Sequence, residues 1–393
     1  MLKITGIICE YNPLHLGHQK QLRMIREADP DGVIVCLMSG NYVQRGQPAI
    51  VDKTLRAKAA VMAGADLVLE LPITAALSSA EGFASEGVRI LSHFCTHLCF
   101  GAETAHGDTL METAKALLSD SFPAQLRTQL DKGLSFPAAR AAALEEMGIP
   151  AFTRPNDILA TEYCKAILAQ NSSLIPIPIQ RGGDYHEEAA HQENPSATAV
   201  RKLMIESGMW LDYVPENVRD IFMGAKLHTI DAGERAILSK LRTMTDEDFA
   251  AIPFGSEGLW RKLMHNARRF ANLEDVITAT KSKRYTRTRL DRMVMCAFLG
   301  ISSEMMTSPA PYVRVLAFND AGRKLLRQKK EDFPVLNAGE NTQHPYWQLE
   351  KRAGDLYGLF ATDFPDPPGM EESRRVTYLP SLPLEGKVAR RKP

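Results

Sequence analysis

Short apolar runs alternate with helical patterns through the first half of this 393-residue chain. The runs have the length of β-strands and lie at 4–9, 32–38, 66–71, 97–100 and 174–179. Between them, apolar residues recur with the period of a helix at 18–28, 53–63, 80–91 and 109–118. Such alternation is typical of a parallel sheet with helices on both faces. The sequence therefore predicts an α/β fold built on a doubly wound, Rossmann-like parallel sheet.

The second half of the chain has a different pattern. Helical patterns flank the last strand run at 126–147, 157–170 and 199–207. Beyond about residue 210 the strand runs vanish, and helical patterns dominate at 234–241, 259–270 and 287–299. We therefore predict two domains: a sheet domain over 1–208, and a mainly helical domain over 209–393 whose end, from 363 onward, is extended and rich in proline and charge.

The composition argues against a membrane or secreted protein. No stretch approaches the roughly 18 uninterrupted apolar residues of a membrane span, and the chain starts with a strand pattern rather than a signal peptide. We expect a cytoplasmic protein with no membrane partner. Its six cysteines are scattered, as is typical of reduced thiols. The run 93–100 holds two histidines and two cysteines, but we interpret it as a buried strand because paired Cys-x-x-Cys motifs are absent.

Two histidines stand at the junction between the first strand and the first helix. His15 and His18 flank Gly17, and Pro13 precedes them. The N-terminus of such a helix lies at the ligand-binding edge of the sheet, and its N–H groups and dipole attract phosphate. Two imidazoles there can stabilise the charge that develops as an α-phosphate is attacked and pyrophosphate leaves. Helix capping or a surface position is the alternative interpretation.

The segment His15-Leu-Gly-His18 resembles the HxGH signature of the nucleotidyltransferase superfamily, which includes class I aminoacyl-tRNA synthetases. A larger part of the chain resembles one family within it, the bacterial tRNA(Met) cytidine acetate ligases. The stretches that carry this resemblance span most of the sequence, at 6–18, 38–49, 64–72, 98–103, 195–201 and 283–290. Small departures from the family pattern occur at Gln47, Asp157 and Ala160.

The resemblance implies an enzyme that activates acetate with ATP to acetyl-adenylate. The acetyl group then passes to N4 of the wobble cytidine of elongator tRNA(Met), which forms N4-acetylcytidine. In this scheme His15, His18 and Arg181 are catalytic, with Mg²⁺ assisting and no protein ligand assigned to it. The other ATP contacts implied by the resemblance are Ile7, Ile8, Cys9, Glu10, Tyr11, Asn12, Pro13, Leu14, Leu16, Gly17, Gln19, Lys20, Gly101 and Asn156.

The chemistry of the outlying residues fits these roles. Gly101 ends a predicted strand, Asn156 opens a helix and offers an amide, and Arg181 can pair with phosphate. A turn glycine, an N-cap and a surface arginine are the alternatives. The stretch 195–201 resembles the second phosphate-binding motif of the superfamily, in which Ser196 and Arg201 grip phosphates; an N-cap and a solvated arginine are the alternatives here.

A basic stretch lies in the predicted helical domain. The chain has 47 Lys and Arg residues in total and 47 Asp and Glu residues, so its charges balance. Residues 257–292 nevertheless carry ten basic and four acidic side chains. This local excess of six on an otherwise acidic chain indicates an RNA-binding face. We predict RNA contacts by Lys281, Lys283, Arg284, Tyr285, Arg287 and Arg289, with the tyrosine stacking on a base. A solvated helix face is the alternative.

Several points stay open from the sequence. Asn41, Gln44 and Arg45 follow the second strand, and they contact acetate, RNA or neither. No residue stands out as the general base for acetyl transfer, and the oligomeric state is not determined. Two other functions are considered: a nucleotidyltransferase acting on a small phosphorylated substrate, and a non-catalytic RNA-binding protein.

Overall fold

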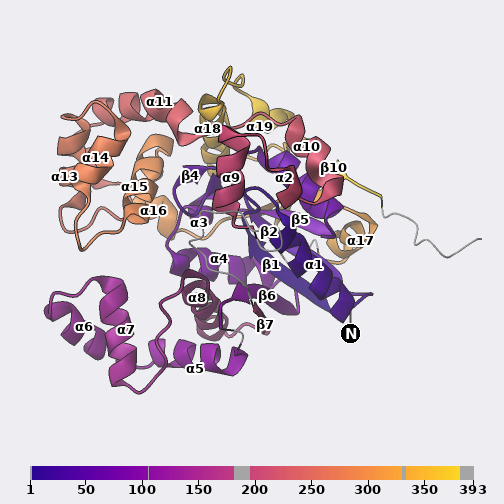
Figure 1. Ribbon diagram of the computed structural model, residues 1–393, viewed down its shortest axis with the longest axis horizontal. Helices are drawn as coiled ribbons and strands as arrows, with labels where there is room; N and C mark the ends of the chain where they lie inside the picture. Colours follow the sequence, from indigo (N-terminus) through magenta and orange to yellow (C-terminus); the bar gives the residue numbers. More distant parts are fainter. Residues whose placement is uncertain (1, 105, 181–194, 330–332, 381–393) are drawn as a thin grey trace, which may run out of the picture.

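The computed structural model of the protein describes residues 2–104, 106–180, 195–329 and 333–380 (Figure 1). A mostly parallel sheet crosses the molecule, and helices cover both of its faces, which confirms the predicted doubly wound α/β fold. Within the described residues the sheet has eight strands: β1 Ile4–Cys9, β2 Val33–Ser39, β5 Leu67–Leu71, β6 His97–Ala102, β7 Ile175–Gln180, β8 Val313–Phe318, β9 Val335–Asn337 and β10 Thr377–Tyr378.

The strand order is β10-β8-β5-β2-β1-β6-β7, with β9 paired to β8. From β1 the chain adds β2 and then β5 on one side, and it returns to place β6 and β7 on the other side. These pairings are all parallel. The reversal leaves a crevice between the carboxyl ends of β1 and β6, which is where ligands of doubly wound folds bind.

Both faces of the sheet are apolar. In β1, Ile4 and Ile8 pack on one side and Ile7 packs on the other, and β2 alternates in the same way. This explains why these strands read as continuous apolar runs in the sequence. The helices that cover the sheet are α1 Leu16–Ala28, α2 Lys53–Met62, α4 Ala80–Leu91, α5 Gly107–Leu117, α8 Pro155–Ala169, α9 Ala197–Glu206 and α17 Asp320–Lys329. Among the described residues, none of the helices combines the length and apolar character that crossing a bilayer requires.

The single helix predicted over 126–147 is wrong. The structure has two helices instead, α6 (Phe122–Asp131) and α7 (Phe136–Glu146). Gly133 between them adopts a positive φ of 84°, which ends α6, and a proline occupies the first turn of α7. The pair shares a small core with the end of α5 and projects from the sheet at the lower left of Figure 1.

A second group of helices lies beside the sheet, and this confirms the predicted mainly helical region. Its members are α11 Ile230–Thr243, α12 Asp246–Ala250, α13 Leu259–Ala267, α14 Leu273–Thr280, α15 Arg287–Leu299, α16 Ser303–Thr307 and α18 Tyr346–Tyr357. They share a hydrophobic core centred on side chains such as Ile237, Leu263 and Met295. The domain boundary at residue 208 stays a prediction.

The prediction that no strands follow residue 210 is wrong. The strand β8 pairs antiparallel with β5, and β9 and β10 pair with β8. Arg314 interrupts the apolar run Val313–Phe318, so the sequence pattern does not identify this segment as a strand. In the structure Arg314 is 1 % exposed, and its Nε donates to Glu350 at 2.9 Å. A buried ion pair thus places an arginine where the pattern of a central strand requires an apolar residue.

Candidate active site

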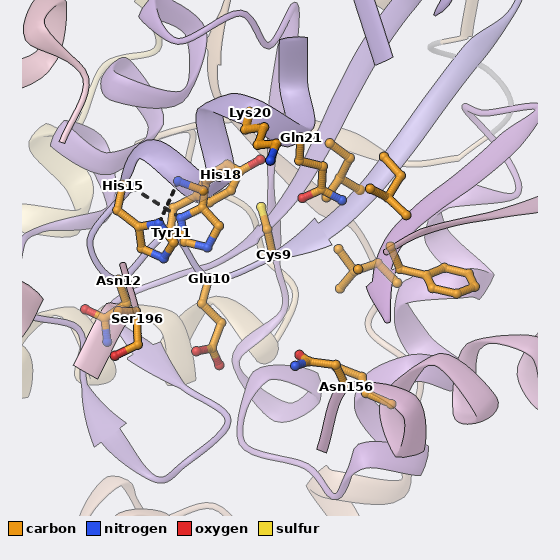
Figure 2. Close-up of a pocket in the computed structure, with 18 of the residues that line it drawn as sticks. Cys9, Glu10, Tyr11, Asn12, His15, His18, Lys20, Gln21, Asn156 and Ser196 are labelled. Carbon is orange, nitrogen blue, oxygen red and sulfur yellow. Dashed lines mark hydrogen bonds between the residues drawn. The ribbon is translucent and has the colours of Figure 1, made fainter. Parts of the chain in front are cut away.

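A cleft of about 310 Å³ opens at the carboxyl ends of β1, β6 and β7, where the strand order reverses (Figure 2). Its walls come from the loop between β1 and α1, from the ends of β6 and β7, and from the first turns of α8 and α9. Segments far apart in the chain therefore meet around one space, whose volume is that of a pocket for a small ligand.

The two histidines lie together on one wall of the cleft. His15 is the N-cap of α1, and its ring stacks on the ring of His18 with centroids 3.7 Å apart and 25° between the planes. The backbone N–H of Gly17 donates to Nδ1 of His15 at 3.1 Å, and the N–H of His15 donates to Nδ1 of His18 at 3.3 Å. The imidazoles thus form a capping box, which is usually made by a hydroxyl and a carboxylate.

These capping bonds fix the tautomer of both rings. Because Nδ1 of each ring accepts a backbone N–H, the proton of each neutral ring lies on Nε2. An Nε2–H group is a donor suited to a phosphate oxygen. A Cβ at Gly17 would lie 3.0 Å from Cε1 of His15, so the glycine leaves room for this ring. Capping by Nδ1 leaves Nε2 of both rings available for the predicted catalytic role, so the two interpretations do not exclude each other.

The loop before the histidines is tied to helix α9. The Asn12–Pro13 peptide bond is cis, and Asn12 accepts the N–H of Ile50 on its Oδ1 at 2.7 Å. Arg201, from the second turn of α9, donates from Nη1 to the carbonyl oxygen of Asn12 at 2.6 Å. Ser196 is the N-cap of α9, because its Oγ accepts the N–H of Ala199 at 3.1 Å, and it also lines the cleft.

Asn156 reaches the cleft from the first turn of α8, on the side opposite the histidines (Figure 2). Its Nδ2 donates to Oε1 of Glu103 at 2.6 Å, and the N–H of Asp157 donates to Oε2 of Glu103 at 2.8 Å. A carboxylate only accepts, so the Asn156 amide must turn its NH₂ group toward Glu103. Asp157 in turn accepts the N–H of Thr104 at 2.7 Å.

Glu10, which follows β1, extends into the cleft between the histidines and Asn156 (Figure 2). Its Oε1 accepts the backbone N–H of Gln44 at 2.8 Å. Gln44 belongs to the hairpin of β3 (Tyr42–Val43) and β4 (Gln47–Pro48). Gln44 and Arg45 line the cleft. Asn41 instead accepts the N–H of Lys53 at 2.8 Å and lines a separate small pocket.

The structure brings most of the predicted nucleotide contacts to this cleft. Those that line it are Ile7, Ile8, Cys9, Glu10, Tyr11, Asn12, His15, Gly17, His18, Lys20, Gly101, Asn156, Ser196 and Arg201. Leu14 is fully buried in the core, and Pro13, Leu16 and Gln19 are not among the lining residues. Arg181 lies outside the described residues. The roles of all these predicted residues in nucleotide binding and catalysis stay predictions.

Sequence reasoning missed Glu103 as a residue of the site. The side chain lines the cleft and holds Asn156, which is 53 residues further along the chain. Its position two residues after Gly101 at the end of a predicted strand was the available signal. It was missed because the partner of a carboxylate depends on which segments the fold brings together.

The predicted RNA-binding side chains divide into two groups. Lys281 and Lys283 are exposed, in the segment that connects α14 to α15. The other four make contacts within the protein. Arg284 and Tyr285 both bond Glu257 at 2.8 Å, Arg287 bonds Glu274 at 2.7 Å and Asp291 at 2.8 Å, and Arg289 donates to the Phe254 carbonyl at 2.6 Å. The stacking role of Tyr285 and the other RNA contacts stay predictions.

The cleft hairpin also contacts the basic helix α15. Arg292 donates from Nη1 to the carbonyl oxygen of Gln44 at 3.4 Å. A Cβ at Gly46, whose φ is 73°, would lie 2.5 Å from the backbone nitrogen of Arg292, so the backbones pack directly on each other. The hairpin therefore contacts the basic stretch through α15 and also lines the cleft.

A doubly wound sheet, paired histidines at its first strand–helix junction and a second helix N-terminus across the cleft together define an HxGH-type nucleotidyltransferase fold. Comparison with known proteins agrees. The model of the HIGH Nucleotidyl Transferase family matches residues 2–368. A tRNA(Met) cytidine acetate ligase of Clostridium perfringens is 36% identical over 361 residues, which cover 85% of this chain and 89% of that protein. One of Clostridium novyi is 36% identical over 91% of this chain and 95% of its own length.

Solved structures give the same result. The apo structure of TmcAL from Thermotoga maritima is similar with a TM-score of 0.89 at 28% identity, and the match covers 97% of this chain and 100% of that one. The same Thermotoga protein bound with alpha-thio ATP matches with a TM-score of 0.86. The chain belongs to the tRNA(Met) cytidine acetate ligase family of enzymes.

Proposed function

We propose that the protein is an ATP-dependent ligase that activates acetate as acetyl-adenylate and acetylates N4 of the wobble cytidine of elongator tRNA(Met). The observation that carries this proposal is the stacked pair of His15 and His18, whose tautomer provides two Nε2–H donors beside the first turn of α1 in a nucleotide-sized cleft. The names of the relatives and the ATP analogue bound by the Thermotoga structure support it.

In the first step a carboxylate oxygen of acetate attacks the α-phosphorus of ATP. The bond to the bridging oxygen breaks, and pyrophosphate leaves with that electron pair. Negative charge grows on the α-phosphate oxygens, and donors that are already oriented lower the barrier without being reorganised. The Nε2–H groups of His15 and His18 and the leading amides of α1 supply such donors. Arg181 is proposed to assist from the adjoining segment.

ATP is proposed to extend from the histidines toward α8 and α9. Asn156, held by Glu103, faces the nucleoside end, and Gly101 leaves room for it at the end of β6. The N-terminal end of α9, with Ser196 at the N-cap and Arg201 in the second turn, faces the phosphates. A helix N-terminus with an arginine one turn inside it is a suitable phosphate site.

Mg²⁺ is proposed to enter with the nucleotide. The described residues contain no group of three or more His, Cys, Asp or Glu side chains placed to hold a metal ion. In phosphoryl-transfer sites much of the coordination of Mg²⁺ comes from the substrate phosphates and water, and no protein ligand is assigned to the ion. The ion would neutralise charge on the triphosphate.

The tRNA is proposed to bind along α13 to α15, whose exposed cations include Arg261, Lys262, Lys281 and Lys283. Phosphate contacts of this kind position a nucleic acid without reading its sequence. Because the hairpin of β3 and β4 packs on α15 and lines the cleft, RNA held on α15 has a short path to the adenylate. Since tRNA is a cytoplasmic substrate, the proposal places the protein in the cytoplasm.

Incubation of pure protein with ATP, labelled acetate and bulk tRNA, followed by nucleoside mass spectrometry, tests the proposal. Acetylcytidine should form only when all three substrates are present. ATP turnover without acetate, with a small phosphorylated acceptor, would favour the alternative nucleotidyltransferase. RNA binding without any ATP chemistry would favour the non-catalytic alternative. A His15→Asn, His18→Asn double variant is the control protein, because Asn still accepts a helix N–H.

A further inference from the structure

Acetyl transfer to cytidine requires a proton acceptor. The lone pair of the exocyclic N4 is delocalised into the ring, so this amine is a weak nucleophile. As it attacks a carbonyl carbon it becomes acidic, and a positioned base that takes its proton lowers the barrier. The acceptor must lie in the cleft, beside the acyl group and on the side from which RNA enters.

Most titratable groups on the cleft wall do not suit this role. His15 and His18 carry their protons on Nε2, because Nδ1 of each ring caps α1, so both rings act as donors. Burial raises the pKa of the Cys9 thiol and of the Tyr11 phenol well above their ordinary values, which keeps both groups protonated. Burial likewise raises the pKa of the Tyr163 phenol, and Lys20, Arg45 and Arg201 are basic side chains. The carboxylates Glu10 and Glu103 are the remaining candidates among the described lining residues.

Glu103 already has a structural task. Its Oε1 accepts from the Asn156 amide at 2.6 Å, and its Oε2 accepts the N–H of Asp157 at 2.8 Å. Both oxygens are therefore engaged in fixing the first turn of α8. Protonation of Glu103 would disrupt the contact that orients Asn156, so a base at this position would interfere with nucleotide binding.

Glu10 differs from Glu103 because only one of its carboxylate oxygens is engaged within the described residues. One oxygen, Oε1, is anchored by the N–H of Gln44 at 2.8 Å, while Oε2 has no hydrogen-bond partner among the described residues. The backbone is anchored as well, because Arg56 donates to the carbonyl oxygen of Glu10 at 2.5 Å. Figure 2 shows the carboxylate extending into the cleft, between the histidine pair and Asn156.

The position of Glu10 also matches the proposed path of the RNA. The residue that anchors it, Gln44, accepts a hydrogen bond from Arg292 of α15 on its carbonyl oxygen. The hairpin thus contacts Glu10 on one side and the basic helix on the other. A nucleotide delivered along α15 would enter the cleft next to this carboxylate.

We propose that Glu10 is the general base of acetyl transfer, an inference that rests on the function proposed above. The lone pair of N4 forms a bond to the acetyl carbon. The bond from that carbon to the phosphate oxygen breaks, and its electron pair leaves with AMP. One N4 proton passes to Oε2 of Glu10 and then to solvent. The residue contacts the attacking amine and is therefore catalytic in the second step.

The test separates the two steps with the variants Glu10→Gln and Glu103→Gln. Acetate-dependent exchange of pyrophosphate into ATP reports activation, and a single turnover with synthetic acetyl-adenylate and tRNA reports transfer. We expect E10Q to slow transfer by about 100-fold or more while exchange falls less than about tenfold. E103Q should lower exchange by weakening ATP binding and leave transfer from supplied adenylate much less affected.

A conservative variant gives a readout that a structural role would not change. Glu10→Gln keeps an acceptor for the Gln44 N–H, whereas Glu10→Asp keeps a carboxylate, so E10D should transfer acetyl faster than E10Q. Equal loss of both steps in E10Q, or an E10Q exchange reaction that needs more Mg²⁺, would overturn the proposal in favour of a nucleotide or metal contact. If wild-type protein makes no acetylcytidine at all, the proposed function fails rather than the role of Glu10.

Discussion

Arg201 donates a hydrogen bond from Nη1 to the carbonyl oxygen of Asn12 at 2.6 Å, although 189 residues separate them in the chain. The contact joins helix α9, which carries the predicted second phosphate-binding motif, to the loop that carries the two histidines. Arg201 also donates from Nη2 to the Thr198 hydroxyl at 3.0 Å. The guanidinium thus fixes the distance between the two sides of the proposed triphosphate site.

We expect Arg201→Ala to raise the KM for ATP by about tenfold or more, because it removes a charge near the phosphates and releases the loop at Asn12. Arg201→Lys keeps the charge but lacks the planar fork that reaches two acceptors, so it should recover only part of the affinity. Steady-state pyrophosphate exchange at varied ATP measures both. An unchanged KM in R201A would show that the contact is not needed to shape the site.

Replacing His15 should separate its capping role from its catalytic role. His15→Ala removes both, and we expect a loss of about 1 kcal/mol in unfolding free energy together with a 10²- to 10³-fold loss of pyrophosphate exchange. His15→Asn retains a cap acceptor, so stability should recover while exchange stays low. Urea unfolding and exchange assays on the same preparations provide the comparison. Full activity in H15N would contradict the assignment of Nε2 as a donor to phosphate.

The exposed lysines of the basic stretch should affect RNA binding without affecting stability. In Lys281→Ala, Lys283→Ala we expect weaker tRNA binding and a salt dependence, plotted as log K against log salt, that is shallower by about two. Arg287→Ala is the contrasting variant. It leaves the 9 %-exposed Asp291 side chain without its ion-pair partner and should lower the unfolding free energy by about 1 kcal/mol. Filter binding at several salt concentrations and thermal unfolding distinguish them.

The buried Glu350 should make stability depend on pH. Burial raises its pKa to about 7 against the opposing effect of Arg314, while Glu70 raises it further and Tyr312 and Lys53 lower it. The folded state therefore binds a proton more tightly than the unfolded state does. The contribution of Glu350 to the unfolding free energy is therefore fully present below about pH 4.3, which is the pKa of a glutamate in the unfolded chain. It is lost as the pH rises through about 7.

Glu350→Gln is expected to remove this decline, because the amide keeps the shape but does not titrate. Unfolding free energies from pH 4.5 to 8 would be compared between the two proteins. Asp52 and Glu371 act in the other direction: burial would raise the pKa of each, but nearby cations hold both pKa values low. Their contribution is present above the unfolded pKa and is lost as pH falls, so it should remain in E350Q. An identical pH slope in E350Q and wild type would contradict the role of Glu350.

Local pattern was sufficient for most elements that position the site. The strand at Ile4–Cys9 and the helices at Ala80–Leu91 and Arg287–Leu299 have the predicted bounds, because their periodicity and caps are encoded within the segments themselves. The predicted helix over 126–147 failed because a positive φ at Gly133 outweighed the apolar period. The strand Val313–Phe318 was missed because its arginine is paired with a glutamate 36 residues later.

By itself, the sequence determined the fold class and the strand–helix junction at which the histidines lie, since each depends on residues close together in the chain. Only the tertiary structure decided which oxygen of each carboxylate is engaged and which basic side chains are exposed. The reason is that hydrogen-bond partners and burial are set by segments that meet only when the sheet forms. Glu103 with Asn156 and Glu10 with Gln44 are two such pairings.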